Sequence, residues 1–232
     1  MVIIVSCYNE EDVLFEAAKI LSGKLSRLIS DGIVSEKSGL LFIDDGSSDS
    51  TWALIEKCRS ENPLVLKGIK LAKNCGQPKA LLCGLLSVKD YADIAITVDA
   101  DLQGHEDAID SMLDCYFSGA EIVLGIRTTR GTDSLFRKWG ACAFYSAMRF
   151  FGANLIKNHA YFRLVNRKAI KTLAESSLKN PFLRGNITRL GCKTALVNYK
   201  IKNRFAGKSK YTFRKLFALA AEEIASCLRH EL

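Results

Sequence analysis

Short apolar runs alternate with helical patterns between residues 2 and 126 of the chain. The first run is continuous and β-branched, which suits a strand buried on both faces. Strands are expected at residues 2–6, 39–43, 65–71, 94–98 and 121–126. Helices are expected between them, from residue 9 to about residue 28 and at 51–61, 77–88 and 108–117. This alternation predicts an α/β fold with a mostly parallel central sheet flanked by helices.

Polar residues directly follow three of the expected strands, at residues 7–10, 44–51 and 99–103. In open α/β sheets, ligands bind beyond the carboxyl ends of the strands. Chance does not readily place three polar clusters at three such ends. The pattern therefore predicts a ligand-binding site along that edge of the sheet.

Two carboxylates, Asp99 and Asp101, stand one residue apart just after the expected fourth strand. Hard divalent cations take oxygen ligands, and Mg²⁺ is commonly held by one or two carboxylates plus substrate phosphates. Gln103 adds a neutral oxygen donor nearby. An exposed acidic turn is the alternative, but the position after a buried strand favours a metal site.

The segment at residues 44–51 reads Asp-Asp-Gly-Ser-Ser-Asp-Ser-Thr. Its carboxylates could accept hydrogen bonds from a base or a ribose hydroxyl. The same residue types could instead cap the helix that begins at Thr51. Both roles are compatible if Asp45 binds a ligand while Asp49 or Ser50 caps the helix.

The chain lacks the motifs of several common enzyme classes. It has no glycine-rich dinucleotide fingerprint, no P-loop and no α/β-hydrolase nucleophile elbow. Its three histidines have no metal-ligand spacing, so structural roles are expected for His105, His159 and His230. Its eight cysteines form no CxxC pair, so they are expected to be reduced residues of a cytosolic protein.

The net charge of +8 is concentrated toward the C-terminal end, where residues 193–215 hold lysines and arginines but no acidic residue. Such a segment is compatible with an anionic substrate, an anionic membrane surface or nucleic acid. No recognition helix, RNA-binding motif or zinc motif is present. Nucleic acid is therefore disfavoured as a partner.

The pattern changes after residue 127. Helices are expected at residues 135–151 and 169–175, a strand at 194–201 and a basic loop at 204–211. Residues 212–228 form an amphipathic pattern whose apolar face could pack on the domain or lie on a membrane. No apolar run reaches the roughly 18 residues that span a bilayer, and no signal peptide is visible.

Taken in order, the motifs at residues 8–10, 44–51 and 99–103 resemble those of glycosyltransferase family 2, which has the GT-A fold. The chain is most similar to the polyprenyl-phosphate glycosyltransferases, the subgroup that includes dolichol-phosphate mannose synthase. Further matches to that subgroup lie at residues 74–80, 125–127, 158–164, 182–185 and 204–211.

The resemblance implies a role for each matching residue. The nucleotide-sugar donor would be bound by Tyr8, Asn9, Glu10, Asp45, Lys73 and Asp99. A Mg²⁺ or Mn²⁺ ion would be held by Asp99, Asp101 and Gln103. The acceptor phosphate would contact Arg127, Arg204, Ser209 and Lys210. The catalytic positions would be Asp101, Arg163 and Tyr161.

Tyr161 departs from the related motif, which carries an aspartate proposed as general base at this position. A neutral tyrosine with an ordinary pKa near ~10 is a poor base at pH 7. An acceptor phosphate is already ionised and needs little deprotonation. Three readings stay open: the base is dispensable, another carboxylate replaces it, or the enzyme is impaired.

The resemblance implies an inverting glycosyltransferase that moves a sugar from a nucleotide-sugar, with UDP-glucose preferred, to a polyprenyl phosphate. Residues 1–211 would form the GT-A catalytic domain and residues 212–232 a juxtamembrane amphipathic helix. Related chains usually continue into transmembrane helices, so we expect truncation before them and action at the cytoplasmic face of a membrane. The alternatives are a catalytically impaired nucleotide-sugar-binding protein and a family 2 transferase with a non-lipid acceptor.

Overall fold

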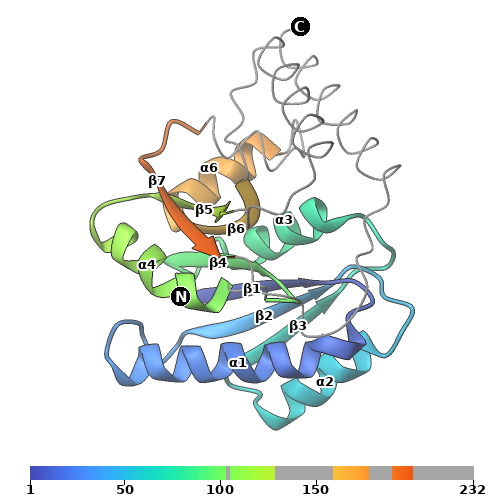
Figure 1. Ribbon diagram of the computed structural model, residues 1–232. Helices are drawn as coiled ribbons and strands as arrows, with labels where there is room; N and C mark the ends of the chain where they lie inside the picture. Colours follow the sequence, from blue (N-terminus) through green and yellow to red (C-terminus); the bar gives the residue numbers. More distant parts are fainter. Residues whose placement is uncertain (103–104, 129–158, 178–189, 201–232) are drawn as a thin grey trace, which may run out of the picture.

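The computed structural model describes residues 1–102, 105–128, 159–177 and 190–200 of the 232-residue chain. Within these ranges the chain forms a seven-stranded sheet with helices on both faces (Figure 1). The expected helices at residues 135–151 and 212–228, and the division after residue 211, lie outside the described residues. Among the described helices, none combines the length and apolar character needed to cross a bilayer.

The first half of the fold follows the predicted alternation closely. Its elements are β1 (Val2–Cys7), α1 (Glu11–Ser30), β2 (Gly39–Asp44), α2 (Thr51–Glu61), β3 (Leu66–Lys70), α3 (Gln77–Val88) and β4 (Ile94–Asp99). The second half contains α4 (His105–Phe117), β5 (Ile122–Thr128), β6 (His159–Asn166), α6 (Arg167–Ser177) and β7 (Thr194–Lys200). The helix α4 begins three residues before the predicted start at Ala108.

The strands lie in the order β3-β2-β1-β4-β6-β5-β7. β1 pairs in parallel with β2 and β4, β2 pairs in parallel with β3, and β5 pairs in parallel with β7. β6 is antiparallel to both β4 and β5, so β5 and β7 run in the same direction as β1. The predicted mostly parallel sheet is confirmed, and the C-terminal ends of six described strands face one edge.

β6 is the strand that the sequence analysis did not predict. Its side chains alternate between the two faces of the sheet, and both faces are covered. Phe162 and Leu164 lie in one core cluster, Val165 lies in the other, and Arg163 is fully buried between them in the sequence. Because all four positions are buried, the strand shows no apolar-polar alternation, and its charged residue disguises the apolar run.

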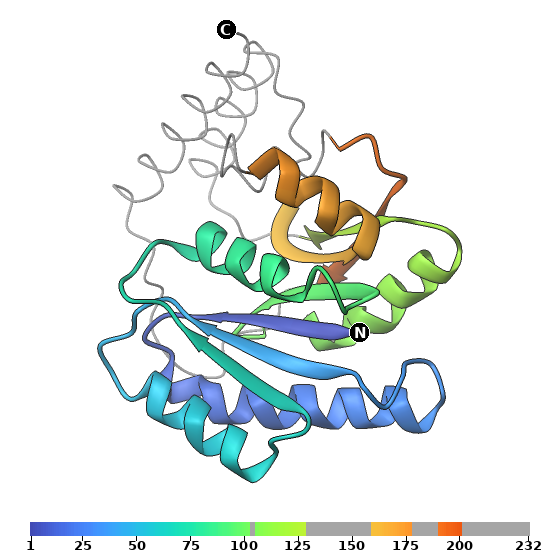
Figure 2. The same cartoon turned by 180° about the vertical axis from the view of Figure 1, so that it is seen from behind.

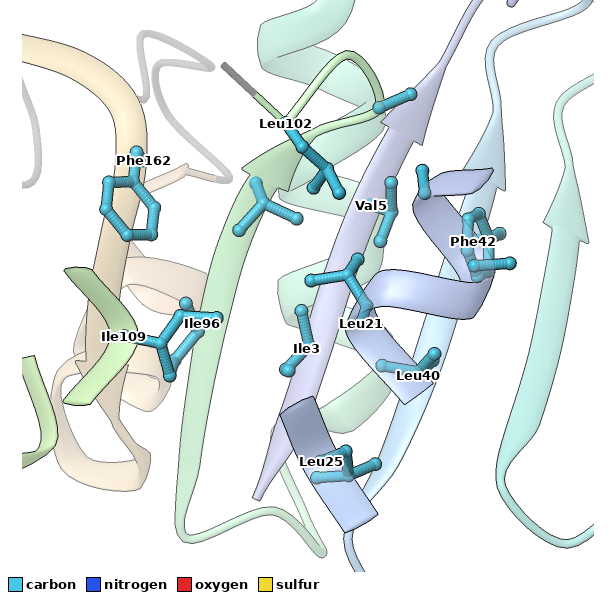
Figure 3. Close-up of a cluster of buried hydrophobic side chains, with 14 of the residues drawn as sticks. Ile3, Val5, Leu21, Leu25, Leu40, Phe42, Ile96, Leu102, Ile109 and Phe162 are labelled. Atoms are coloured by element: carbon cyan, nitrogen blue, oxygen red, sulfur yellow. The ribbon is translucent and has the colours of Figure 1, made fainter. Parts of the chain in front are cut away.

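Two apolar cores hold the helices against the sheet. On one face, α1, α2 and α4 pack on side chains such as Ile3, Val5 and Phe42, and Figure 3 shows Leu21 and Leu25 of α1 directed toward them. On the opposite face, α3 and α6 cover the sheet (Figure 2). The central strand β1 is buried along its whole length. Burial of this apolar area from water is the main stabilising contribution to such a layered fold.

A charged contact joins α1 to α4 on the first face. The Asp110 carboxylate accepts a hydrogen bond from the Lys24 ammonium and two from Nη2 of Arg27, each 2.9 Å long. Burial raises the pKa of Asp110, but the hydrogen bonds and charges of Lys24 and Arg27 outweigh it, so the pKa lies below its ordinary value. The ionised carboxylate is therefore favoured in the folded state.

We expect Asp110→Asn to destabilise the fold by about 0.5–1 kcal/mol at neutral pH, because the pair is partly exposed and screened by water. A depressed pKa contributes stability above the unfolded value and loses it as the pH falls through the folded value. Urea unfolding of the wild type and the variant should therefore differ at neutral pH and converge as the pH falls through the depressed pKa of Asp110.

Asp114→Asn is the matched control, because Asp114 lies one turn further along α4 and is exposed. It should cause no loss of stability at either pH. A pH-independent deficit in Asp110→Asn would contradict the ion pair as its cause.

Candidate active site

The register of the sheet brings the three predicted polar clusters to one edge. Cys7 at the end of β1 lies beside Asp44 at the end of β2, and Ser6 lies beside Asp99 at the end of β4. Arg127 of β5 lies beside Tyr199 of β7 at the same edge. Residues far apart in the sequence thus meet because parallel strands end together.

The loop after β1 is bonded to the loop after β2. Asn9 has a positive φ of 52° and its N–H donates to Oγ of Ser47 over 2.9 Å. Its side-chain Oδ1 accepts from the N–H of Ser48 over 2.8 Å. The N–H of Glu10 donates to Oγ1 of Thr51 over 2.8 Å. Asn9 and Glu10 therefore shape the edge of the sheet, and their predicted contact with a nucleotide-sugar stays a prediction.

The helix α2 begins at the second of these loops. Ser50 occupies the N-cap position but makes no side-chain capping bond. Asp49 fills that role, because its Oδ1 accepts from the N–H of Thr51 over 3.0 Å. Of the two predicted capping residues, the structure selects Asp49.

Asp45 anchors a third loop, between β3 and α3. Its two carboxylate oxygens accept from the N–H groups of Cys75 and Gly76, over 2.7 and 2.9 Å. Burial raises the pKa of Asp45, and these two bonds oppose the rise without cancelling it. Asp45 is only 2% exposed. Its predicted contact with the nucleoside is untested, and a structural role is evident.

Gly46 lies where this third loop crosses the second. Its φ is +69°, and a Cβ built on it would lie 2.5 Å from the carbonyl carbon of Lys73. Lys73, another predicted donor-binding residue, is exposed in that same loop, and Tyr8 is half-buried at the end of β1. The close contact at Gly46 sets how these loops sit against each other.

Asp99 is held from two sides at the end of β4. Its Oδ1 accepts from the side-chain amide of Gln77, the first residue of α3, which also donates to Oγ of Ser6 over 3.3 Å. Its Oδ2 lies 3.4 Å from Nη2 of Arg127. Two predicted site residues, Asp99 and Arg127, are thus in direct contact.

The turn after Asp99 is fixed by an apolar side chain. Leu102 has a positive φ of 50°, which is unusual for a bulky residue, and is 6% exposed. Figure 3 shows its side chain pointing from this turn into the core beneath β1 and β4. The turn carries Asp101, which is half-buried. Packing of Leu102 therefore fixes the backbone of the turn that carries Asp101.

Arg127 also contacts an aromatic cluster formed by Tyr199, His105 and Phe162. Its Nε donates to the hydroxyl of Tyr199 over 3.0 Å, and Nε2 of His105 lies 3.3 Å from that hydroxyl. The His105 ring stacks on Phe162 with 4.6 Å between centroids. Burial, followed by the charge of Arg127, lowers the pKa of His105 to about 4, although Asp101 opposes the shift. The imidazole is therefore neutral at physiological pH.

The charge of Arg127 is favoured in this setting. Burial lowers the pKa of a guanidinium, but Tyr199 and Asp99 outweigh that effect and raise the pKa of Arg127. For Tyr199, whose neutral form is protonated, burial raises the pKa, although the charge of Arg127 opposes the rise. Tyr199 is therefore a neutral hydroxyl beside a permanent cation.

The remaining predicted catalytic positions lie on β6. Arg163 is fully buried, and its guanidinium carbon lies 5.4 Å from the centroid of the Tyr161 ring. The backbone carbonyl of Tyr161 accepts from Oγ1 of Thr97 on β4. Tyr161 thus packs against Arg163 by a cation–π contact.

The donor atoms at this edge suit a divalent cation shared with a diphosphate. Asp99 and Asp101 offer carboxylate oxygens, which Mg²⁺ and Mn²⁺ prefer, and each oxygen retains lone pairs beside its present bonds. Among the described residues, no group of three His, Cys, Asp or Glu side chains could hold a metal by itself. The third predicted ligand, Gln103, lies outside the described residues.

Sequence reasoning did not select three residues that the geometry adds: Gln77, His105 and Tyr199. The spacing of the predicted strand at residues 194–201 gave a partial signal, because Val197 and Tyr199 share its buried face. Nothing in the sequence showed that Gln77 would reach Asp99. The predicted Arg204, Ser209 and Lys210 lie outside the described residues.

A mostly parallel sheet with acidic, basic and amide side chains at its carboxyl edge is typical of α/β proteins that bind a ligand at that edge. Residues 2–174 match the family glycosyl transferase family 2. The chain belongs to this family and is a glycosyltransferase.

Related proteins agree with this assignment. The chain is 42% identical over 226 residues to the uncharacterized glycosyltransferase YkoT of Bacillus subtilis (strain 168), covering 97% of this chain and 67% of that protein. It is 30% identical to the prophage bactoprenol glucosyl transferase homolog of Escherichia coli (strain K12), covering 97% and 71%. It is 33% identical to the bactoprenol glucosyl transferase of Shigella phage SfV, covering 81% and 60%.

Solved structures share the fold at low identity. Glucosyl-3-phosphoglycerate synthase from Mycobacterium tuberculosis, in complex with Mn²⁺, uridine-diphosphate-glucose and phosphoglyceric acid, has a TM-score of 0.58 at 17% identity, covering 97% of this chain and 79% of that one. Mannosyl-3-phosphoglycerate synthase from Rubrobacter xylanophilus has a TM-score of 0.59 at 16% identity, covering 99% and 73%. The predicted GT-A fold is confirmed.

We expect Gly46→Ala to destabilise the protein by about 2–4 kcal/mol, because it adds a steric clash to an unfavourable backbone conformation. Thermal unfolding checks the stability, and the amide resonances of residues 73–76 report displacement of the β3–α3 loop.

Gly32→Ala separates the two causes. Gly32 has nearly the same φ of +67°, but a Cβ there would meet nothing within 4 Å. Its alanine variant should lose only about 1 kcal/mol. Equal losses at the two positions would show that the loop contact at Gly46 contributes nothing.

Proposed function

We propose that this glycosyltransferase moves glucose from UDP-glucose to a polyprenyl phosphate, with inversion at the anomeric carbon and with Mg²⁺ or Mn²⁺. The observation that carries the proposal is the pairing of Asp99, beside Asp101, with Arg127 at one edge of the sheet. This arrangement sets a carboxylate pair for a metal-bound diphosphate beside a cation for a second phosphate. The names of the bactoprenol glucosyl transferases support both glucose and the lipid phosphate.

The reaction forms one bond and breaks one. A phosphate oxygen of the acceptor attacks the anomeric carbon from the face opposite the leaving group. The bond from that carbon to the nucleoside diphosphate breaks, and its electron pair leaves with UDP. The products are glucosyl polyprenyl phosphate and UDP. The attacking phosphate is already ionised, so the step needs no general base at position 161.

The residues of the edge act on charge and position. A bound metal ion would be held by Asp99 and Asp101 and would stabilise the negative charge of the departing diphosphate. Gln77 holds Asp99 through a hydrogen bond and so orients its carboxylate. Arg127 would neutralise the acceptor phosphate as two anions approach each other.

The membrane enters the proposal through the acceptor. A polyprenyl phosphate resides in a bilayer, so its phosphate must reach the edge of the sheet from the membrane surface. The basic residues predicted to assist, Arg204, Ser209 and Lys210, and the amphipathic segment at residues 212–228 lie outside the described residues. Their contact with the acceptor or an anionic surface is part of the proposal.

A second function has one specific observation in its favour. Tyr161 stands where the related motif carries an aspartate, and its ring packs against the buried Arg163. A chain that had lost turnover would still bind a nucleotide-sugar at this edge. Binding without product formation would identify this alternative.

Calorimetric titration tests the donor and the metal together. With Mn²⁺ present, we expect UDP-glucose to bind more tightly than UDP-N-acetylglucosamine or GDP-mannose, and EDTA should abolish the binding. Asp101→Ala should weaken UDP-glucose binding by at least about a hundredfold, because one carboxylate ligand is lost. Its control, Asp114→Asn, removes an exposed carboxylate of α4 and should bind as the wild type does.

Tight binding by Asp101→Ala in the presence of Mn²⁺ would show that the metal assignment is wrong. Binding of GDP-mannose alone would leave the metal site intact but replace the proposed donor.

Turnover by Tyr161→Phe tests the need for a base. The variant keeps the ring on Arg163 but removes the hydroxyl, so we expect kcat within about threefold of the wild type. Tyr161→Asp is the partner variant and should bring no large gain. A kcat rise of about a hundredfold in Tyr161→Asp would instead favour the impaired-enzyme alternative.

A further inference from the structure

The hydrogen bonds beneath Arg127 have a fixed direction. An arginine side chain can only donate, so the Tyr199 hydroxyl accepts from Nε of Arg127 over 3.0 Å. That leaves the hydroxyl proton free to be donated to Nε2 of His105, 3.3 Å away. This series of hydrogen bonds therefore runs from Arg127 through the Tyr199 hydroxyl to His105.

His105 is suited to be the final acceptor. When Nε2 accepts this bond, the ring proton lies on Nδ1, which is buried and has no hydrogen-bond partner among the described residues. Stacking on Phe162 at 4.6 Å and an edge contact with Tyr199 at 5.1 Å between centroids fix the plane of the ring. His105 is completely buried, so water does not compete for its nitrogen.

The backbone also holds Tyr199 in place. Its carbonyl accepts from Oγ1 of Thr128 over 2.8 Å, and the residue pairs with Arg127 across the two parallel strands. Tyr199 is 4% exposed. The hydroxyl thus occupies a defined position below the guanidinium.

We propose that Tyr199 and His105 are positioning residues, which fix the guanidinium of Arg127 at the sheet edge so that it faces the acceptor phosphate. The Nε–H edge of the guanidinium group is held by the Tyr199 hydroxyl, and Nη2 is directed at Asp99. This inference rests on the proposed function, in which Arg127 binds that phosphate. In this proposal, both residues act through Arg127 and not by binding the substrate themselves.

Tyr199→Phe tests the first link, because it removes one oxygen and keeps the ring. We expect the KM for a polyprenyl phosphate to rise about tenfold, with kcat and the KM for UDP-glucose within about threefold. Hydrogen exchange of the Arg127 Nε–H, followed by NMR, should accelerate at least about tenfold, because its buried acceptor is gone. Tyr116→Phe is the control, because Tyr116 is a half-buried tyrosine of α4. It should change neither the KM for the polyprenyl phosphate nor the exchange rate of the Arg127 Nε–H.

His105→Phe tests the second link and keeps a ring to stack on Phe162. The two substitutions act through one chain of hydrogen bonds, so the double variant should be no worse than Tyr199→Phe alone. Additive effects on the acceptor KM would overturn the proposal. A general packing defect would also overturn it. That defect would lower kcat and thermal stability and raise the KM values for both substrates.

The two proposals can fail separately. If the wild-type protein transfers no glucose to polyprenyl phosphate, the proposed function fails, and the exchange rate of Arg127 in Tyr199→Phe decides the hydrogen-bond chain by itself. If the wild-type protein is active but neither exchange nor acceptor KM changes in Tyr199→Phe, the positioning role is wrong and the function stands.

Discussion

The parallel pairing of β1 with β2 on one side and β4 on the other determines where the polar clusters of the candidate site lie. β1 is buried along its whole length and covered by helices on both faces, so the sheet around it is mostly apolar. They collect where the strands end, and parallel strands end together. Cys7, Asp44 and Asp99 therefore meet at one edge although the sequence separates them widely. The antiparallel β6 restores the direction for β5, which brings Arg127 to the same place.

Many of the residues at this edge form hydrogen bonds with one another. Asp45 ties down the β3–α3 loop, Asn9 ties the loop after β1 to the loop after β2, and Gln77 and Arg127 flank Asp99. Such contacts fix the side chains before any ligand arrives, so less ordering entropy is lost on binding. Preorganised charges also stabilise a developing anion without having to rearrange. In the proposed function, this edge of the sheet would hold the diphosphate of the donor and the phosphate of the acceptor.

The sequence was sufficient for those features that depend on local pattern. Buried strands show as apolar runs, and their polar ends marked the edge, so the α/β fold and the meeting of Asp99 with the loops after β1 and β2 were predictable. β6 was not, because Arg163 is buried in a strand covered on both faces and interrupts the apolar pattern. The contacts of Gln77, His105 and Tyr199 depend on which strands and helices lie beside one another in three dimensions. A single sequence carries no direct signal of that arrangement. Asp45 was predicted to bind donor, and its bonds to the β3–α3 loop became visible only in three dimensions.

The proposed reaction at this edge transfers glucose from a nucleotide-sugar to a lipid phosphate. The most direct test incubates the protein with Mn²⁺, radiolabelled UDP-glucose and a polyprenyl phosphate in detergent micelles, then extracts the lipid. We expect radioactive lipid that releases glucose on mild acid treatment and that forms only when metal and lipid phosphate are both present. Two results together would contradict the lipid as substrate. The label would stay in the aqueous phase when polyprenyl phosphate is the acceptor, and it would pass to a soluble phosphorylated acceptor when one is supplied instead.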